Sequence, residues 1–224
     1  MFRAALFTLL LLAAGATAGA ADAEAPAWYD VEVLVFKNNT PPAPDGELWP
    51  VDPGVPDLGR AVELVPPPQS NPLPGPAQPF QQLADANFSL NTAAARLSAS
   101  RDYRPLLHLA WRQPVSAQAD APAVQLHGEG EDAGAAGMEP MGIAPARELD
   151  GTVRVSRNRF LHIDVDMIYR DPAVRDGAAQ YRLQQSRRVN SGEVHYFDHP
   201  AFGVLVKLTP FDPQGQKDGR APPR

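Results

Sequence analysis

Cysteine is absent from this 224-residue sequence, and lysine occurs only three times. Without cysteine the chain can form no disulfide, no thiolate nucleophile and no cysteine-ligated metal site, and it offers no cysteine for lipid anchoring. The lysines are Lys37, Lys207 and Lys217, and none has a serine three residues before it. The sequence therefore excludes a cysteine transpeptidase and argues against a Ser-x-x-Lys acyl-enzyme.

Long apolar runs are also scarce. The clearest run covers residues 4–14, directly after Arg3, and it is too short to span a bilayer. Small residues follow and include Ala18-Gly19-Ala20, which fits the A-x-A cleavage pattern. We therefore predict that residues 1–20 are a signal peptide cleaved near Ala20 rather than a buried N-terminal helix. The mature chain is then expected to be a soluble periplasmic protein without an integral membrane segment.

Charge is distributed unevenly along the chain. Residues 1–150 carry 8 Lys and Arg against 18 Asp and Glu, whereas residues 151–224 carry 12 against 8. A basic C-terminal part on an acidic, exported protein argues against nucleic-acid binding. It is compatible with a local site for an anionic or carboxylate-bearing ligand, but we favour the simpler interpretation of arginines on a solvated sheet face.

Composition divides the mature chain into one domain and its appendages. A short leader at 21–27 precedes a single domain at 28–210, and a flexible tail follows at 211–224. Within the domain, residues 41–79 contain 13 prolines, so we expect a long irregular excursion there. Residues 117–147 are rich in Ala and Gly and predict a loop region around one short strand.

The remaining segments predict strands and one short helix. Residues 28–36 and 105–111 are rich in β-branched, aromatic or leucine residues, and 91–97 predict a helix with Asn91 as its N-cap. Further along, the sequence predicts a hairpin of 152–155 with 161–169, a second hairpin of 181–189 with 193–197, and a last strand at 203–209. These elements predict an α+β fold, a mainly antiparallel sheet with one or two short helices against a face.

The strand at 161–169 has the clearest two-residue period. Alternation places His162, Asp164 and Asp166 together on the face opposite the apolar positions. Such a set could bind a hard or borderline metal, but solubility alone requires polar residues on a solvent face. We therefore favour a solvated face, and the sequence predicts no metal, no cofactor and no catalytic residue.

Arginine, histidine and aromatic residues gather in the C-terminal part. Guanidinium groups bind carboxylates through two parallel hydrogen bonds, and aromatic rings provide flat faces for sugars, so the combination suits a peptide-bearing glycan. The candidate ligand-binding residues are Arg154, Arg157, Arg159, His162, Asp164, Arg182, Arg188, His195, Tyr196, His199 and Trp111.

Four ordered blocks of the sequence resemble the CsiV family of periplasmic peptidoglycan-binding proteins. They are WYDVEVLVFKN (28–38), YRPLLHLAWRQP (103–114), LDGTVRVSRNRFLHIDVDMIYR (149–170) and YRLQQSRRVNSGEVHYFDHPAFGVLVKLTP (181–210). The resemblance implies a non-enzymatic protein of the Gram-negative envelope that binds peptidoglycan and supports cell-wall synthesis and cell shape. It further implies, as a partner, the lipoprotein activator of a bifunctional penicillin-binding protein.

Two other functions remain open from the residues alone. The first is an envelope hydrolase acting on glycan or peptide, because a pair of catalytic carboxylates is recognised by geometry and not by spacing. The second is a protein-binding scaffold whose Pro-rich excursion docks a partner.

Overall fold

The computed structural model describes residues 26–40, 50, 52–67, 77–128, 147–172 and 179–214. The predicted signal peptide, most of the Ala/Gly-rich loop and the tail beyond 214 lie outside these residues. No helix in the described ranges is long and apolar enough to cross a membrane.

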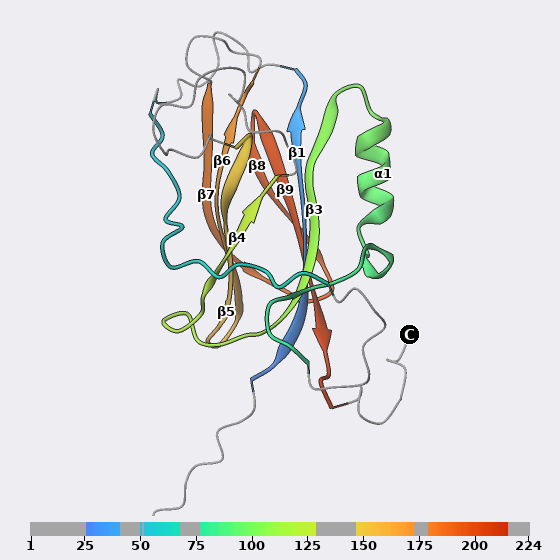
Figure 1. The fold of residues 1–224 in the computed structure, drawn as a ribbon, viewed down its shortest axis with the longest axis vertical. Helices are drawn as coiled ribbons and strands as arrows, with labels where there is room; N and C mark the ends of the chain where they lie inside the picture. The colour runs from blue at the N-terminus through green and yellow to red at the C-terminus, as the bar shows by residue number, and fades with distance from the viewer. Residues whose placement is uncertain are drawn as a thin grey trace, which may run out of the picture.

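Two antiparallel sheets and one α-helix make up the described part of the chain (Figure 1). Sheet A has the order β2-β3-β1-β9-β8, and sheet B has the order β4-β5-β6-β7. The strands of sheet A are β1 (Trp28–Asn38), β2 (Gln81–Gln82), β3 (Tyr103–Pro114), β8 (Val194–His199) and β9 (Phe202–Phe211). Those of sheet B are β4 (Ala123–His127), β5 (Leu149–Arg157), β6 (Leu161–Arg170) and β7 (Gln180–Val189).

The predicted α+β class is therefore wrong. The chain is mostly antiparallel β-structure, with a single α-helix, α1 (Asn91–Ala99), and a short 3-10 helix (Asp85–Asn87) in the described ranges. The prediction assumed one sheet covered by helices. Instead, a second sheet covers the first, so strands provide both sides of the core.

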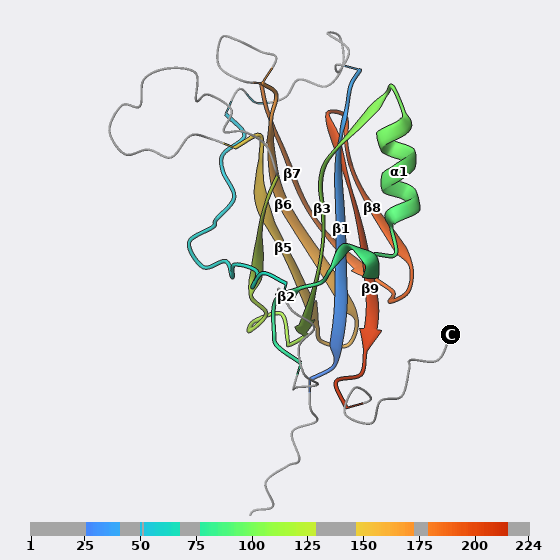
Figure 2. The same ribbon diagram turned by 45° about the vertical axis from the view of Figure 1, so that its right-hand side comes forward.

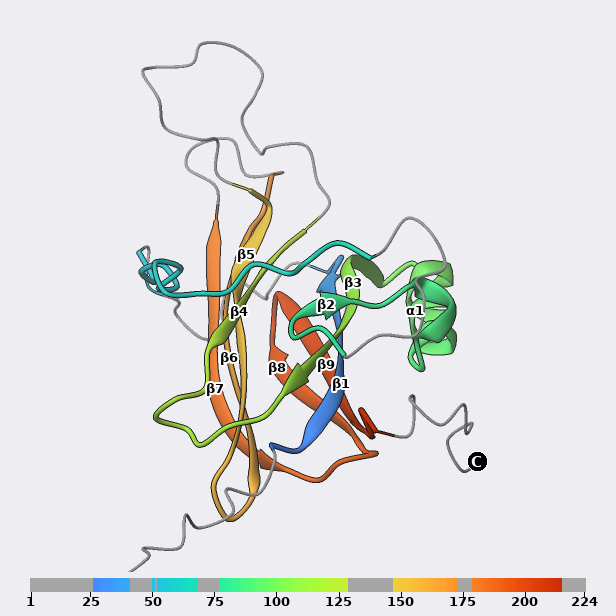
Figure 3. The same cartoon turned by 60° about the horizontal axis from the view of Figure 1, so that its bottom comes forward.

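The molecule has three layers, which Figure 3 shows as sheet B, sheet A and α1. The core lies between the sheets and contains Val33 and Val204 from sheet A and Val153, Ile163 and Met167 from sheet B. The outward face of sheet A carries α1, which packs on β3. The outward face of sheet B is open to solvent over part of its area.

Strand β1 lies in the middle of sheet A, between β3 and β9 (Figure 2). Its residues are buried on both faces: Val33 and Val35 face sheet B, and Leu34 and Phe36 face the other way. A nearly continuous run of apolar residues is what a strand covered on both sides requires. This central position holds the rest of sheet A in register.

The second predicted hairpin does not form. Strand β7 pairs with β6 in sheet B, whereas β8 pairs with β9 in sheet A, so residues 190–193 carry the chain from one sheet to the other. Gly192 has a φ of 84°, which suits the turn, and its amide donates to the Leu208 carbonyl. The turn residues correctly predicted a break, but they contain no information on which neighbour each strand will pair with.

The described Pro-rich residues 52–67 form an ordered strap over sheet B. Near its start the Pro53 carbonyl accepts a hydrogen bond from Arg182 of β7 at 3.2 Å. Further along, Val62 bridges to Val124 of β4, and Val65 bridges to Gln81 of β2. The strap therefore crosses the outward side of sheet B and connects it to the edge of sheet A.

The helix begins one residue earlier than a cap at Asn91 requires. Leu90 occupies the N-cap position, and Asn91 is the first helical residue. Its side-chain amide donates back to the carbonyls of Asp85 and Phe88. The prediction of Asn91 as the cap is therefore wrong, because Asn91 already has helical backbone geometry and its side chain bonds to the preceding segment.

Candidate functional site

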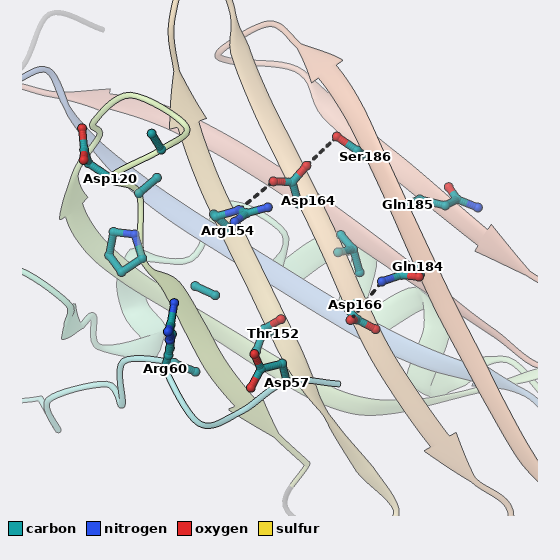
Figure 4. A pocket seen from close by; sticks show the side chains of 16 residues that line it. Asp57, Arg60, Asp120, Thr152, Arg154, Asp164, Asp166, Gln184, Gln185 and Ser186 are labelled. Atoms are coloured by element: carbon teal, nitrogen blue, oxygen red, sulfur yellow. Dashed lines mark hydrogen bonds and ion pairs between the residues drawn. The ribbon is translucent and has the colours of Figure 1, made fainter. Parts of the chain in front are cut away.

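An open groove lies on the outward face of sheet B, with a volume of about 790 Å³ (Figure 4). Strands β5, β6 and β7 form its floor. One wall is the strap, through Asp57, Arg60 and Ala61, and the other is the loop at residues 119–122. Both walls come from segments that the sequence marked only as irregular.

The floor of the groove is built from rows of directly paired residues. Strand register places Arg154 of β5, Asp164 of β6 and Ser186 of β7 in one row. The row beside it contains Thr152, Asp166 and Gln184. All six side chains point to the same side of the sheet, because residues two apart on a strand share a face.

Each floor carboxylate is paired with an arginine. The Arg154 Nε lies 2.8 Å from Asp164 Oδ2, and the Ser186 hydroxyl donates to the other carboxylate oxygen. Arg182 donates from Nε and Nη2 to both oxygens of Asp166, each at 2.8 Å. These hydrogen bonds with Asp166 raise the pKa of Arg182. Each negative charge of the floor is therefore neutralised by a neighbouring arginine, and the hydrogen bonds fix the positions of these side chains.

A further amide lies within the same network. Gln184 Nε2 donates to Asp166 Oδ2 at 3.3 Å, and Gln185 also lines the groove. Amide, hydroxyl, guanidinium and carboxylate groups are therefore all present along one floor. Such a surface offers hydrogen-bond donors and acceptors to a polar ligand without a strong net charge.

Another row continues the same face beyond the groove floor. Ser156, His162 and Arg188 are paired across β5, β6 and β7. His162 Nδ1 lies 3.1 Å from the carbonyl oxygen of Phe160, in the turn that joins β5 to β6. Arg157 and Arg159 are exposed at this same turn. The structure thus brings five of the eleven candidate residues to one outward face, Arg154, His162, Asp164, Arg182 and Arg188, and it places Arg157 and Arg159 at the turn beside that face.

The other four candidates lie on strands β3 and β8 of sheet A. Trp111 is fully buried, and its indole N–H donates to Gln113, so its ring is enclosed in the core. His199 is also buried; its Nδ1 accepts the amide of Ala201, and burial lowers its pKa. His195 Nε2 lies 2.9 Å from the Asn190 carbonyl oxygen.

Tyr196 is the exposed aromatic candidate of sheet A. Its side of the sheet is opposite to the core, its ring lies parallel to that of Phe36, and 42% of its surface is accessible. Burial and the hydrogen bond to Asp198 raise its pKa. A Cβ on Gly203 would lie 2.6 Å from the Tyr196 ring, so this glycine is what allows the ring to lie on the sheet.

Sequence reasoning missed the walls of the groove. The signal for an ordered strap was present as two Asp-x-Gly triplets, in which the aspartate carboxylate accepts the glycine amide two residues later. These bonds join Asp52 to Gly54 and Asp57 to Gly59. Nothing in the local pattern, however, predicts that the strap lies over β5 and β6.

The comparisons with known proteins point to one family. The family model described as "Peptidoglycan-binding protein, CsiV" matches residues 5–211, which is most of the chain. This match confirms the resemblance seen in the four sequence blocks. No curated protein and no solved structure matches the chain.

Proposed function

Because the chain belongs to the CsiV family of peptidoglycan-binding proteins, we propose that it binds peptidoglycan without cleaving it, in the groove over sheet B. The predicted signal peptide supports a periplasmic location, where this polymer is found. In this proposal the protein is an accessory of cell-wall synthesis and cell shape and not an enzyme.

The observation that carries the proposal is the charge-balanced floor of the groove. A glycan strand presents hydroxyl and acetamido groups, which bind through many hydrogen bonds and not through net charge. Arg154, Asp164 and Asp166 are already held by their neighbours, so their remaining donors and acceptors have fixed directions. Fixed polar groups lose little conformational entropy on binding, which favours affinity for such a ligand.

The same pairing supports binding without turnover. A glycosidase requires one carboxylic acid that donates a proton and a second carboxylate that acts as base or nucleophile. Asp164 and Asp166 each contact an arginine at 2.8 Å and accept a further hydrogen bond from Ser186 or Gln184, so the oxygens of both carboxylates are already engaged by neighbours. Neither acid has the apolar surroundings that make a carboxyl group a proton donor.

A steric block of the groove tests the proposed binding surface. Ala117 and Ala119 are exposed in the same loop, but only Ala119 lines the groove. Ala119→Trp should weaken binding to purified sacculi at least tenfold in a co-sedimentation assay, and Ala117→Trp should bind like the wild type. Equal binding by the two variants would exclude the groove.

Product analysis tests the proposed lack of catalysis. Sacculi incubated with the pure protein should release no soluble muropeptides above the level of a buffer control. If the wild type releases muropeptides and Asp164→Asn or Asp166→Asn does not, the protein is instead a hydrolase that uses that carboxylate.

The protein partner implied by the resemblance needs its own experiment. Co-purification of the tagged mature chain with the lipoprotein activator of a bifunctional penicillin-binding protein should depend on the folded domain. Binding to that protein in the absence of any binding to sacculi would favour the scaffold function instead.

A further inference from the structure

Three arginines at the β5–β6 turn have no acidic partner within the described part of the chain. Arg157, Arg159 and Arg188 appear in no ion pair there, and all three are exposed. Together with Phe160, which lies among them, we call these residues the arginine corner. On strands β3, β5, β6 and β7, by contrast, Arg112, Arg154, Arg170 and Arg182 each lie within 2.9 Å of an aspartate, whereas Arg96 and Arg101 at α1 resemble the corner in having no acidic partner among the described residues.

The aromatic ring of Phe160 organises the corner. The guanidinium carbon of Arg188 lies 3.8 Å from the ring centroid, and that of Arg159 lies 5.3 Å from it. Stacking on a ring uses the flat face of a guanidinium group and leaves its N–H edge free to bond. Two cations on one ring also repel each other, and a bound anion would relieve that repulsion.

The corner continues the floor of the groove. Arg188 lies in the row of Ser156 and His162, and this row is next to that of Arg154 and Asp164. Residues two apart on a strand are separated by about 6 to 7 Å, so the corner begins one step beyond the groove. A ligand longer than one sugar unit can therefore contact both surfaces.

We propose that the arginine corner binds the carboxylates of peptidoglycan stem peptides while the groove holds the glycan strand. This inference rests on the proposed function and assigns the two chemical parts of the polymer to two neighbouring surfaces. A carboxylate fits this surface because two N–H groups of a planar guanidinium can donate parallel hydrogen bonds to its two oxygens. Exposed arginines without acidic neighbours supply the positive charge that the balanced groove floor does not.

Charge-matched variants test the assignment. Arg159→Ala with Arg188→Ala removes two charges from the corner. The control, Arg96→Ala with Arg101→Ala, removes two exposed charges at helix α1, on the opposite side of the molecule from the strap (Figure 2). Each protein is tested against intact sacculi and against sacculi whose stem peptides have been removed by an amidase.

The wild type and the control should bind intact sacculi at least tenfold more tightly than stripped glycan, and added salt should reduce the difference. The corner variant should bind intact and stripped sacculi with equal affinity. That affinity should match the affinity of the wild type for stripped sacculi. Arg188→Lys keeps the charge but loses the planar guanidinium group and its two parallel N–H donors. It should therefore lose part of the preference for intact over stripped sacculi. This single, charge-conserving substitution also separates ligand binding from any folding defect of the double variant.

Two results would overturn the inference while leaving the proposed function intact. One is equal binding of intact and stripped sacculi by the wild type, and the other is an unchanged preference in the corner variant. Competition by pyrophosphate with no dependence on stem peptides would show a phosphate site in place of a carboxylate site. Failure of the wild type to bind either material would remove the proposed function itself.

Discussion

The outward faces of the two sheets differ in how far their charged side chains are exposed to solvent. On sheet A, helix α1 and the segment before it cover a charged side chain, Glu32, which is only 6% exposed. On sheet B, Asp164 and Asp166 stay at the surface of an open groove. One face thus encloses a charge, whereas the other leaves its charges accessible.

Glu32 connects the central strand to the helix. Its carboxylate accepts the amides of Ser89 and Leu90, both at 2.8 Å, and the Ser89 hydroxyl at 2.6 Å, and it lies 2.9 Å from His108 Nε2. Burial alone would raise the pKa of Glu32, but the hydrogen bonds from His108, Ser89 and Leu90 outweigh it and lower the pKa to about 2. The carboxylate thus anchors the two residues that lead into α1, Ser89 and the N-cap residue Leu90.

We therefore expect a polar residue on the sealed face to support stability, and we propose that one on the open face supports binding. A buried carboxylate with several donors cannot be removed without leaving those donors unpaired. A partly exposed ion pair contributes little to stability, since water replaces the lost contact. Substitutions on the two faces should therefore separate the two properties.

The largest effect is expected from Glu32→Ala. Removing the carboxylate leaves the amides of Ser89 and Leu90 without their acceptor, and we expect the free energy of unfolding to fall by about 3 kcal/mol. Urea denaturation followed by circular dichroism measures this change. Binding to sacculi by the folded fraction should be unaffected, and a loss of less than about 1 kcal/mol would contradict the anchoring role of Glu32.

Lowering the pH should reveal the contribution of Glu32 to the stability of the wild-type protein. Because the pKa of Glu32 is lowered to about 2 in the folded state, the unfolded chain binds its proton more readily. The stabilisation is complete above about pH 4.5 and is lost as the pH falls towards 2, to a total of about 3 kcal/mol. Urea denaturation at a series of pH values should show this component in the wild type and not in Glu32→Gln.

A smaller effect is expected from the strap. Gly54 has a φ of 70°, and an added Cβ would lie 2.9 Å from Arg182 Nη1, so Gly54→Ala should destabilise the protein by about 1 kcal/mol. It should also weaken binding to sacculi, because the strap forms a wall of the groove. Gly59→Ala is the matched control, since its Cβ would meet only Asp57 Oδ1 at 3.5 Å. Equal behaviour of the two variants would show that the strap is not a wall of the site.

The smallest effect on stability is expected from Arg154→Ala. Its side chain is 40% exposed, so loss of the ion pair with Asp164 should change the free energy of unfolding by less than about 1 kcal/mol. Binding to sacculi should nevertheless fall about tenfold, because Asp164 and Arg154 form the centre of the floor. Thermal denaturation and co-sedimentation on the same samples test both statements, and unfolding of this variant would show that the pair is structural.

Sequence periodicity predicted the floor of the site better than its walls. The outward direction of His162 and Asp164 follows from alternation against Ile163 and Val165, which are buried as expected. The hairpin of β5 and β6 also formed as predicted, because its two strands are neighbours in sequence. Trp111 was a candidate on chemistry alone, and the second sheet is what encloses it.

Local pattern also could not identify Glu32 as a structural residue. It appears in the sequence as one of two acids in a mostly apolar strand, and its donors lie 57 or more residues away. The same limitation applies to the strap, whose contact from Arg182 to Pro53 spans 129 residues. Contacts at such separations depend on how the sheets pack, and periodicity contains no information on packing.

By itself, the sequence determined the family, the lack of any cysteine chemistry and the face to which each residue of β6 points, because these follow from composition and a period of two. Tertiary structure alone decided that β7 and β8 belong to different sheets, that Glu32 anchors the residue at the N-cap of α1 and that the Pro-rich strap forms one wall of a groove. The physical reason is that a strand has two edges that can hydrogen-bond to any neighbour. The choice depends on which arrangement buries the most apolar surface across the whole chain.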